Sequence, residues 1–122
     1  MKMSRDWAKS MNVDMEAFTP KGFENLWPTM PAEAMEMFFG KGINPEGLDA
    51  KTRLMLTLAG LTVLGAQAEA QIRLTVRHLV EAGATKQEIA EVIAQMGMFA
   101  GVPAMTKAME LATEVLEKDE SA

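Results

Sequence analysis

Leu-Asp-Ala-Lys-Thr-Arg-Leu-Met-Leu-Thr-Leu-Ala-Gly-Leu-Thr-Val-Leu-Gly, residues 48–65, is the stretch that decides the fold. From Leu54 to Leu64 almost every residue is apolar or small, and on a helix these residues surround the whole circumference. A helix that is apolar on all sides is buried on more than one side. A chain of 122 residues can hardly enclose it alone, so we expect a subunit partner to cover part of it.

Helix signals precede and open this central stretch. Pro31 suits the first turn of a helix over residues 32–39, and Gly40 is expected to end that helix in the left-handed conformation. Asp49 is a suitable N-cap for the central helix. The sequence therefore predicts a short helix followed by the long apolar one.

Three further helices are predicted after the central stretch. One runs from about residue 67 to 82, with Gly83 just beyond its end. Residues 85–88, Thr-Lys-Gln-Glu, form a capping box for the next helix. Gly101 ends that helix and Pro103 opens the last one. The helix after the capping box carries a helical apolar stripe: Ile89, Val92, Ile93, Met96 and Ala100.

No stretch shows the sustained alternation and turn chemistry of a β-hairpin, so we expect no sheet. The chain is predicted to be one all-α domain over residues 1–122, a bundle of about five or six helices joined by short connections. Residues 1–27 form an N-terminal arm, broken by Pro20 and Gly22. This arm either wraps a neighbour or covers a pocket, or it is a loosely packed leader.

The composition excludes several classes of function. The net charge of −5 and the lack of a basic tract argue against nucleic-acid binding. The chain has no cysteine, so chemistry that needs a thiolate is excluded. It has a single histidine, which argues against a transition-metal site. The N-terminus lacks the apolar core of a signal peptide, and the longest apolar stretch is too short to cross a bilayer. We expect a soluble cytoplasmic protein without a membrane partner.

Seven short motifs follow one another between residues 48 and 116: Leu48-Asp-Ala-Lys-Thr-Arg53, Leu58-Ala59, Leu64-Gly65, Glu81-Ala-Gly-Ala-Thr85, Glu88-Ile-Ala-Glu-Val92, Gln95 and Ala100-Gly-Val-Pro-Ala104. In these motifs the chain resembles the carboxymuconolactone decarboxylase family, which also contains the AhpD-like alkylhydroperoxidases. The region around Gln95 and Gly101 is closer to the decarboxylase branch. The resemblance implies an AhpD-like helical bundle assembled as a homo-oligomer, a trimer or a hexamer, with no cofactor.

The departures from the family pattern bear on the reaction. The cysteine pair of the hydroperoxidase branch falls on Ala68 and Gln71, neither of which can form a thiolate, so Cys-dependent peroxidase activity is excluded. The glutamate expected in the decarboxylase branch falls on Leu54, and its histidine falls on Thr75. Neither residue exchanges a proton near neutral pH, so a proton carrier would have to come from elsewhere.

His78 is the candidate proton carrier, because it lies one helical turn after Thr75. Gln71, Thr75 and His78 are spaced by four and three residues and so form one polar strip on a helix. If the strip faces the central helix, it places polar groups in an apolar cavity beside Leu54 and Met55, as in small-molecule sites. Alternatively, His78 is a helix-end histidine and the strip faces water.

Arg53 and Arg77 are candidates to hold a substrate carboxylate, since a guanidinium binds one through two hydrogen bonds. Lys51 and Arg73 offer similar charge. The structural alternative is that all four pair with acidic side chains at the surface or in another subunit.

Two main hypotheses follow for function. The first is a decarboxylase-like protein that binds a small organic acid or lactone, with His78 as acid or base, Gln71 and Thr75 orienting the substrate, and Arg53 or Arg77 holding its carboxylate. The second is a non-catalytic oligomer that kept the fold and lost the active site. A weaker third reading takes the 12 methionines as a partner-binding surface.

Overall fold

The computed structural model describes residues 27–121, with side chains placed through Lys118. The elements of this part of the chain are all helices: α2 (Ala32–Phe39), α3 (Ala50–Val63), α4 (Glu69–Glu81), α5 (Lys86–Ala100) and α6 (Val102–Ser121). This confirms the predicted all-α fold. Except for Trp27, the predicted N-terminal arm lies outside the described residues. Within residues 27–121 no helix combines the length and apolarity needed to cross a membrane.

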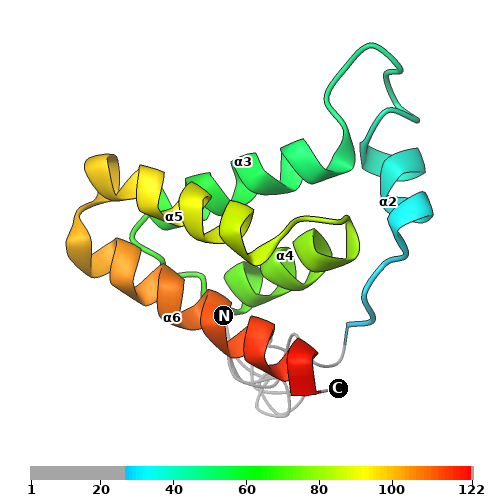
Figure 1. Ribbon diagram of the computed structural model, residues 1–122. Coiled ribbons are helices and arrows are strands. Elements are labelled where there is room, and N and C mark those ends of the chain that lie inside the picture. Colours follow the sequence, from blue (N-terminus) through cyan, green and yellow to red (C-terminus); the bar gives the residue numbers. More distant parts are fainter. Residues whose placement is uncertain (1–26, 122) are drawn as a thin grey trace, which may run out of the picture.

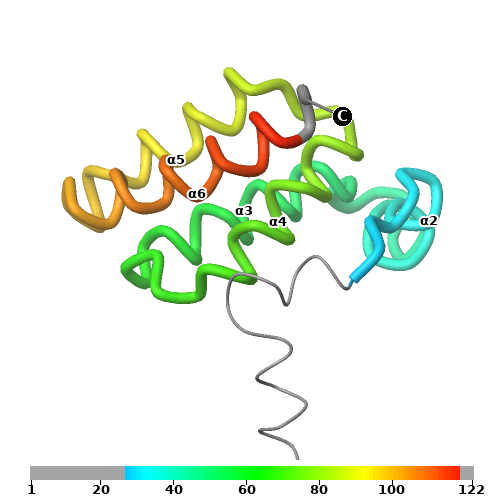
Figure 2. The backbone as a smooth tube through the Cα atoms, turned by 90° about the horizontal axis from the view of Figure 1, so that it is seen from below, coloured from blue at the N-terminus to red at the C-terminus, as the bar shows by residue number. Residues whose placement is uncertain are grey.

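The last four helices form a bundle in which α4 lies between α3 and α6, and α5 packs on both α3 and α6. Figure 1 shows each of these helices running against the direction of the one before it, so that α3 and α5 point the same way. The short connections between consecutive helices impose this alternation. Figure 2 shows α2 set apart at one end, beside α3 and α4.

Every helix of the bundle contributes to one hydrophobic core. Each fully buried large aliphatic side chain stabilises the fold by about 1.5–3 kcal/mol relative to exposure. The predicted stripe of α5 is confirmed in the first half of the helix, where Ile89 and Ile93 are fully buried. Their core neighbours come from the three other helices: Leu58, Ile72, Val76, Leu79, Ala108, Leu111 and Ala112.

The predicted caps of α3 and α5 are both confirmed. The Asp49 carboxylate accepts a hydrogen bond from the backbone N–H of Thr52 at 2.8 Å, and hydrogen bonding from the Thr52 side chain, followed by that from its backbone, holds the pKa of Asp49 below its ordinary value. The Thr85 hydroxyl accepts from the N–H of Glu88 at 3.0 Å, and the Glu88 carboxylate accepts from the N–H of Thr85 at 2.9 Å. The bond from Thr85, followed by the contact with Lys51, lowers the pKa of Glu88. Both helices therefore begin where the sequence predicts.

The prediction for Gly40 is wrong in its mechanism. Its φ is −119°, outside the left-handed region. A Cβ atom at this position would lie 2.0 Å from Oε2 of Glu36. The Glu36 carboxylate accepts from the N–H groups of Lys41 and Ala50, and so joins the end of α2 to the start of α3. Glycine is needed here because a Cβ atom would also lie 2.9 Å from the backbone nitrogen of Ala50, which cannot swing aside as a carboxylate can. Left-handed backbone occurs instead at Gly83, where φ is +95°.

Candidate functional site

The polar strip predicted on α4 consists of three side chains in different surroundings. Gln71 is exposed, Thr75 is buried and His78 is half-buried. The Thr75 hydroxyl donates to the carbonyl of Gln71 at 2.7 Å, a bond within the helix. A hydroxyl that donates in this way can still accept a hydrogen bond, but its proton is already used in the bond to the helix backbone.

Both ring nitrogens of His78 are engaged with backbone groups. The N–H of Met30 donates to Nε2 at 3.0 Å, and Nδ1 lies 2.8 Å from the carbonyl oxygen of Leu74. A backbone N–H can only donate and a carbonyl can only accept. The pair of bonds therefore requires a neutral imidazole with its proton on Nδ1 and none on Nε2. His78 is thus used as a link between α4 and the segment that precedes α2.

Arg77, the neighbour of His78, binds the same segment. Its guanidinium donates to the backbone carbonyl of Trp27. We call Arg77 and His78 the α4 clamp, because together they hold Trp27 and Met30 against α4. The two bonds join residues 50 and 48 positions apart in the sequence. The clamp therefore fixes where the chain enters the helical bundle.

The cationic residues at the start of α3 are also engaged. Nε of Arg53 donates to the carbonyl of Leu48 at 3.0 Å, which ties Arg53 to the turn before its own helix. Nζ of Lys51 lies 2.9 Å from Oε2 of Glu88, so this pair joins the starts of α3 and α5. Lys51 therefore pairs with an acidic side chain, which was the structural alternative to holding a substrate carboxylate.

Arg73 is the polar side chain whose position the sequence did not predict. The sequence offered it either as a cation for a substrate carboxylate or as a surface partner of acidic side chains, yet it is buried between α4 and α6. Its guanidinium pairs with Glu114 at 3.1 Å and with Glu69 at 3.4 Å, and Lys107 pairs with Glu69 at 3.2 Å. The spacing of four between Glu69 and Arg73 was the one available signal. The other partner, Glu114, lies on α6, so the spacing within α4 could not reveal it.

The positions where the family resemblance expects proton carriers hold no titratable group. Leu54 is half-buried and packs against the core, and Thr75 makes its bond within α4. Among the described residues no group of three or more His, Asp and Glu is placed to hold a metal ion. A depression of about 520 Å³ runs along α6, where Met105 and Met109 line it together with threonines and glutamates, and neither residue of the α4 clamp is among its lining residues.

A match to a protein-family model gives evidence that is independent of the fold and the motifs. The model of the carboxymuconolactone decarboxylase family matches residues 28–114, which is well over half of the chain. The chain belongs to the carboxymuconolactone decarboxylase family. It is 38% identical over 71 residues to a protein of Acinetobacter baylyi named 4-carboxymuconolactone decarboxylase, a match that covers 58% of this chain and 52% of that relative.

A second relative extends the similarity across the chain. An uncharacterized 15.0 kDa protein encoded in the nqo9-nqo10 intergenic region of Paracoccus denitrificans is 53% identical over 121 residues. That alignment covers 98% of this chain and 90% of the relative. This carboxymuconolactone decarboxylase family member has no cysteine.

Proposed function

We propose that this carboxymuconolactone decarboxylase family protein is a non-catalytic homo-oligomer, which uses the family fold for assembly. The observation that carries the proposal is the bonding of His78. Its Nδ1 faces a carbonyl and its Nε2 faces an N–H donor, so neither nitrogen is directed at a substrate. General acid–base catalysis requires a titratable group within hydrogen-bond reach of the reacting atom.

The rest of the predicted site supports the same proposal. The guanidinium of Arg77 donates to the backbone carbonyl of Trp27, and that of Arg53 donates to the backbone carbonyl of Leu48. Both cations therefore bind backbone groups of their own chain. Leu54 contributes hydrocarbon where the decarboxylase branch has a carboxylate. The helix α3 nevertheless keeps the apolar character of an assembly core, since Leu56, and Leu64 just after its end, remain exposed in the single chain.

Native mass spectrometry of protein purified without added ligand tests this proposal. The expected result is a defined multiple of the 13.3 kDa subunit, without a small-molecule adduct. A monomer at micromolar concentration would contradict the assembly. One specific adduct per subunit would contradict a purely structural role.

A second candidate function is binding of a small organic acid or lactone, with decarboxylation or isomerisation by proton transfer. The juxtaposition of a guanidinium and an imidazole in the α4 clamp favours it. If residues 27–30 moved aside, Arg77 would hold a carboxylate and His78 would present Nε2 to the substrate. The name of the Acinetobacter relative is consistent with such a substrate class.

Isothermal titration calorimetry with muconolactone-type acids tests this second candidate. Arg77→Gln is expected to abolish any binding that uses the clamp, while Arg53→Gln, at the start of α3, leaves it unchanged. No heat with the wild-type protein across the panel would eliminate the candidate. Equal binding by both variants would show that the carboxylate is held elsewhere.

A further inference from the structure

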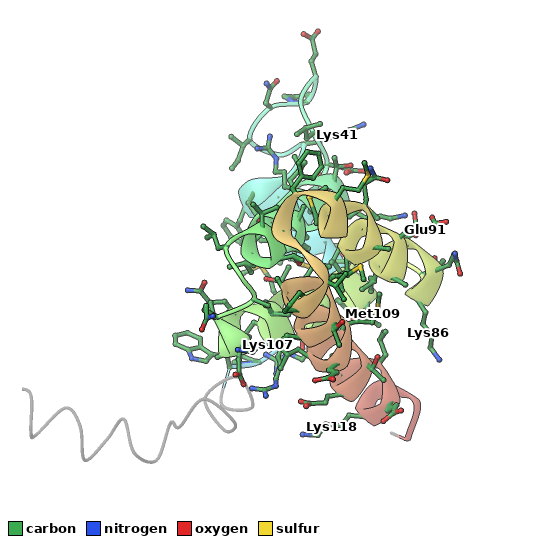
Figure 3. All side chains as sticks on the ribbon, turned by 90° about the vertical axis from the view of Figure 1, so that its left-hand side faces the viewer. Lys41, Lys86, Glu91, Lys107, Met109 and Lys118 are labelled. Carbon is green, nitrogen blue, oxygen red and sulfur yellow. The ribbon has the colours of Figure 1, made fainter. Side chains whose placement is uncertain are left out.

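The outer side of α6 carries the depression of about 520 Å³, which we call the α6 depression. Among the described residues its lining comes from α6 alone: Met105, Thr106, Met109, Glu110, Thr113, Glu114 and Glu117. Met105 and Met109 are half-buried and pack against the core, whereas the three glutamates are exposed. Figure 3 shows Met109 on the side of α6 opposite to Lys107. The α6 depression therefore joins apolar surface to negative charge.

The α6 depression is suited to a segment that is both apolar and cationic. A single helix presents a convex surface, so its half-buried methionines are fully covered only when a further segment lies along them. Glu110, Glu114 and Glu117 follow one another at intervals of four and three residues, and like charges at this spacing repel one another. A cationic occupant offsets this repulsion, while its apolar side chains contact the methionines.

The first 11 residues of the chain, which precede the part that the structure describes, have this composition. They hold three cationic side chains and one acidic one, whereas the rest of the chain holds nine cationic and sixteen acidic ones. The cations are Lys2, Arg5 and Lys9, and they alternate with large apolar side chains: Met3, Trp7 and Met11. A tryptophan and two methionines offer a large and adaptable apolar contact area. Residues 1–11 are therefore complementary to the α6 depression in charge and in apolarity.

The helices α4 and α6 lie side by side and run in the same direction. Glu69, in the first turn of α4, pairs with Lys107 at 3.2 Å, and Arg73, one turn further along, pairs with Glu114 at 3.1 Å. Figure 1 shows the same arrangement of the two helices. The end of α4 therefore lies toward the Glu117 end of the α6 depression.

The described chain begins at this end of α4, because Arg77 donates to the backbone carbonyl of Trp27. From Glu117 to Met105 the α6 depression is about 18 Å long, at a rise of about 1.5 Å per helical residue. Residues 12–26 separate the cationic segment from Trp27. A flexible chain of this length spans about 20 Å. Residues 1–11 can therefore reach the α6 depression of their own chain.

We propose that residues 1–11 dock along the α6 depression of the same chain. Trp7 and the methionines beside it contact Met105 and Met109, and the cations of the segment pair with the three glutamates. Because Arg77 holds Trp27 beside α6, the segment is present at the effective concentration that a short flexible linker gives, of the order of millimolar. The proposal goes beyond the proposed function and does not depend on it, since segment and depression belong to one chain.

Tryptophan fluorescence tests the docking, with circular dichroism to confirm the fold of each variant. The chain has two tryptophans, so Trp27→Phe leaves Trp7 as the reporter and keeps the backbone carbonyl that Arg77 binds. In this variant the acrylamide quenching constant of Trp7 is expected to be severalfold lower than in the same chain unfolded in urea. A constant equal to that of the unfolded chain overturns the proposal.

Charge reversal on the same Trp27→Phe background tests whether the α6 depression is the docking site. Replacing Glu110 and Glu117 by lysine is expected to raise the quenching constant of Trp7 toward its unfolded value, because the cationic segment is then repelled. Replacing Glu46 and Glu91 by lysine changes the net charge equally at exposed positions outside the depression, and is expected to leave the constant unchanged. Equal effects of the two double replacements overturn the assigned site.

Carbodiimide cross-linking, which joins a lysine amine to a carboxylate in contact with it, shows which copy supplies the segment. Isotope-labelled and unlabelled chains are mixed in urea, refolded together, cross-linked and analysed by mass spectrometry. Cross-links from Lys2 or Lys9 to the glutamates of α6 are expected within chains of one label. Cross-links that join a labelled to an unlabelled chain would show that another copy supplies the segment, and would overturn docking within one chain.

Discussion

Replacing His78 by alanine is expected to loosen the chain where it enters the bundle. The change removes the acceptor of the Met30 N–H bond at 3.0 Å and the donor to Leu74 at 2.8 Å. A neutral hydrogen bond contributes about 0.5–1.5 kcal/mol net. Since His78 is half-buried, water replaces part of what is lost. We therefore expect the free energy of unfolding to fall by about 1–2 kcal/mol.

Urea denaturation and amide hydrogen exchange measure the two parts of this prediction. The midpoint of denaturation should fall in His78→Ala, and the amide of Met30 should exchange faster. Gln71→Ala is a matched control, because Gln71 is an exposed residue of the same helix, and its effect should stay within about 0.5 kcal/mol. If His78→Ala has the stability of the wild type and leaves exchange at Met30 unchanged, the clamp does not hold this segment.

Three more perturbations test particular contacts. Arg73→Met removes the pairs with Glu69 and Glu114 and should lower the free energy of unfolding by about 1–2 kcal/mol in urea; an unchanged midpoint would show that the network contributes nothing. Gly40→Ala places a Cβ atom 2.0 Å from a Glu36 carboxylate oxygen, and calorimetry should show a destabilisation of about 1–3 kcal/mol; wild-type melting would refute the close approach. The pKa of Glu88 lies below its ordinary value of 4.5 in the folded protein, so its contribution to stability is present above that pH and is lost as the pH falls. Thermal melts between pH 7 and pH 3 should therefore show a smaller acid-induced loss in Glu88→Gln than in the wild type, and parallel curves would contradict this.

Much of the fold is encoded in signals that act over a few residues. The Asp49 cap, the Thr85–Glu88 capping box and the stripe through Ile89 and Ile93 each involve neighbours within one or two turns. Such signals can be read directly from a sequence because helix geometry fixes which residues meet. The helices accordingly begin close to where they were predicted.

The features that the sequence left open depend on partners far along the chain. Glu36 reaches the backbone of Ala50 across 14 positions, and Arg73 meets Glu114 across 41. His78 accepts from Met30 across 48 positions, which no helical periodicity reveals. The candidate site residues were chosen by type and spacing, whereas their bonding is decided by which backbone groups the tertiary fold brings to them.

The rate of decarboxylation of 4-carboxymuconolactone, followed by ultraviolet absorbance, tests the central claim most directly. The positive control is the Acinetobacter baylyi relative named 4-carboxymuconolactone decarboxylase. Because His78 is bonded through both nitrogens, and the positions where the family resemblance expects proton carriers hold Leu54 and Thr75, the wild-type protein and His78→Ala should both show only the uncatalysed rate. Turnover by the wild type that disappears in His78→Ala would contradict the account and make His78 the proton carrier.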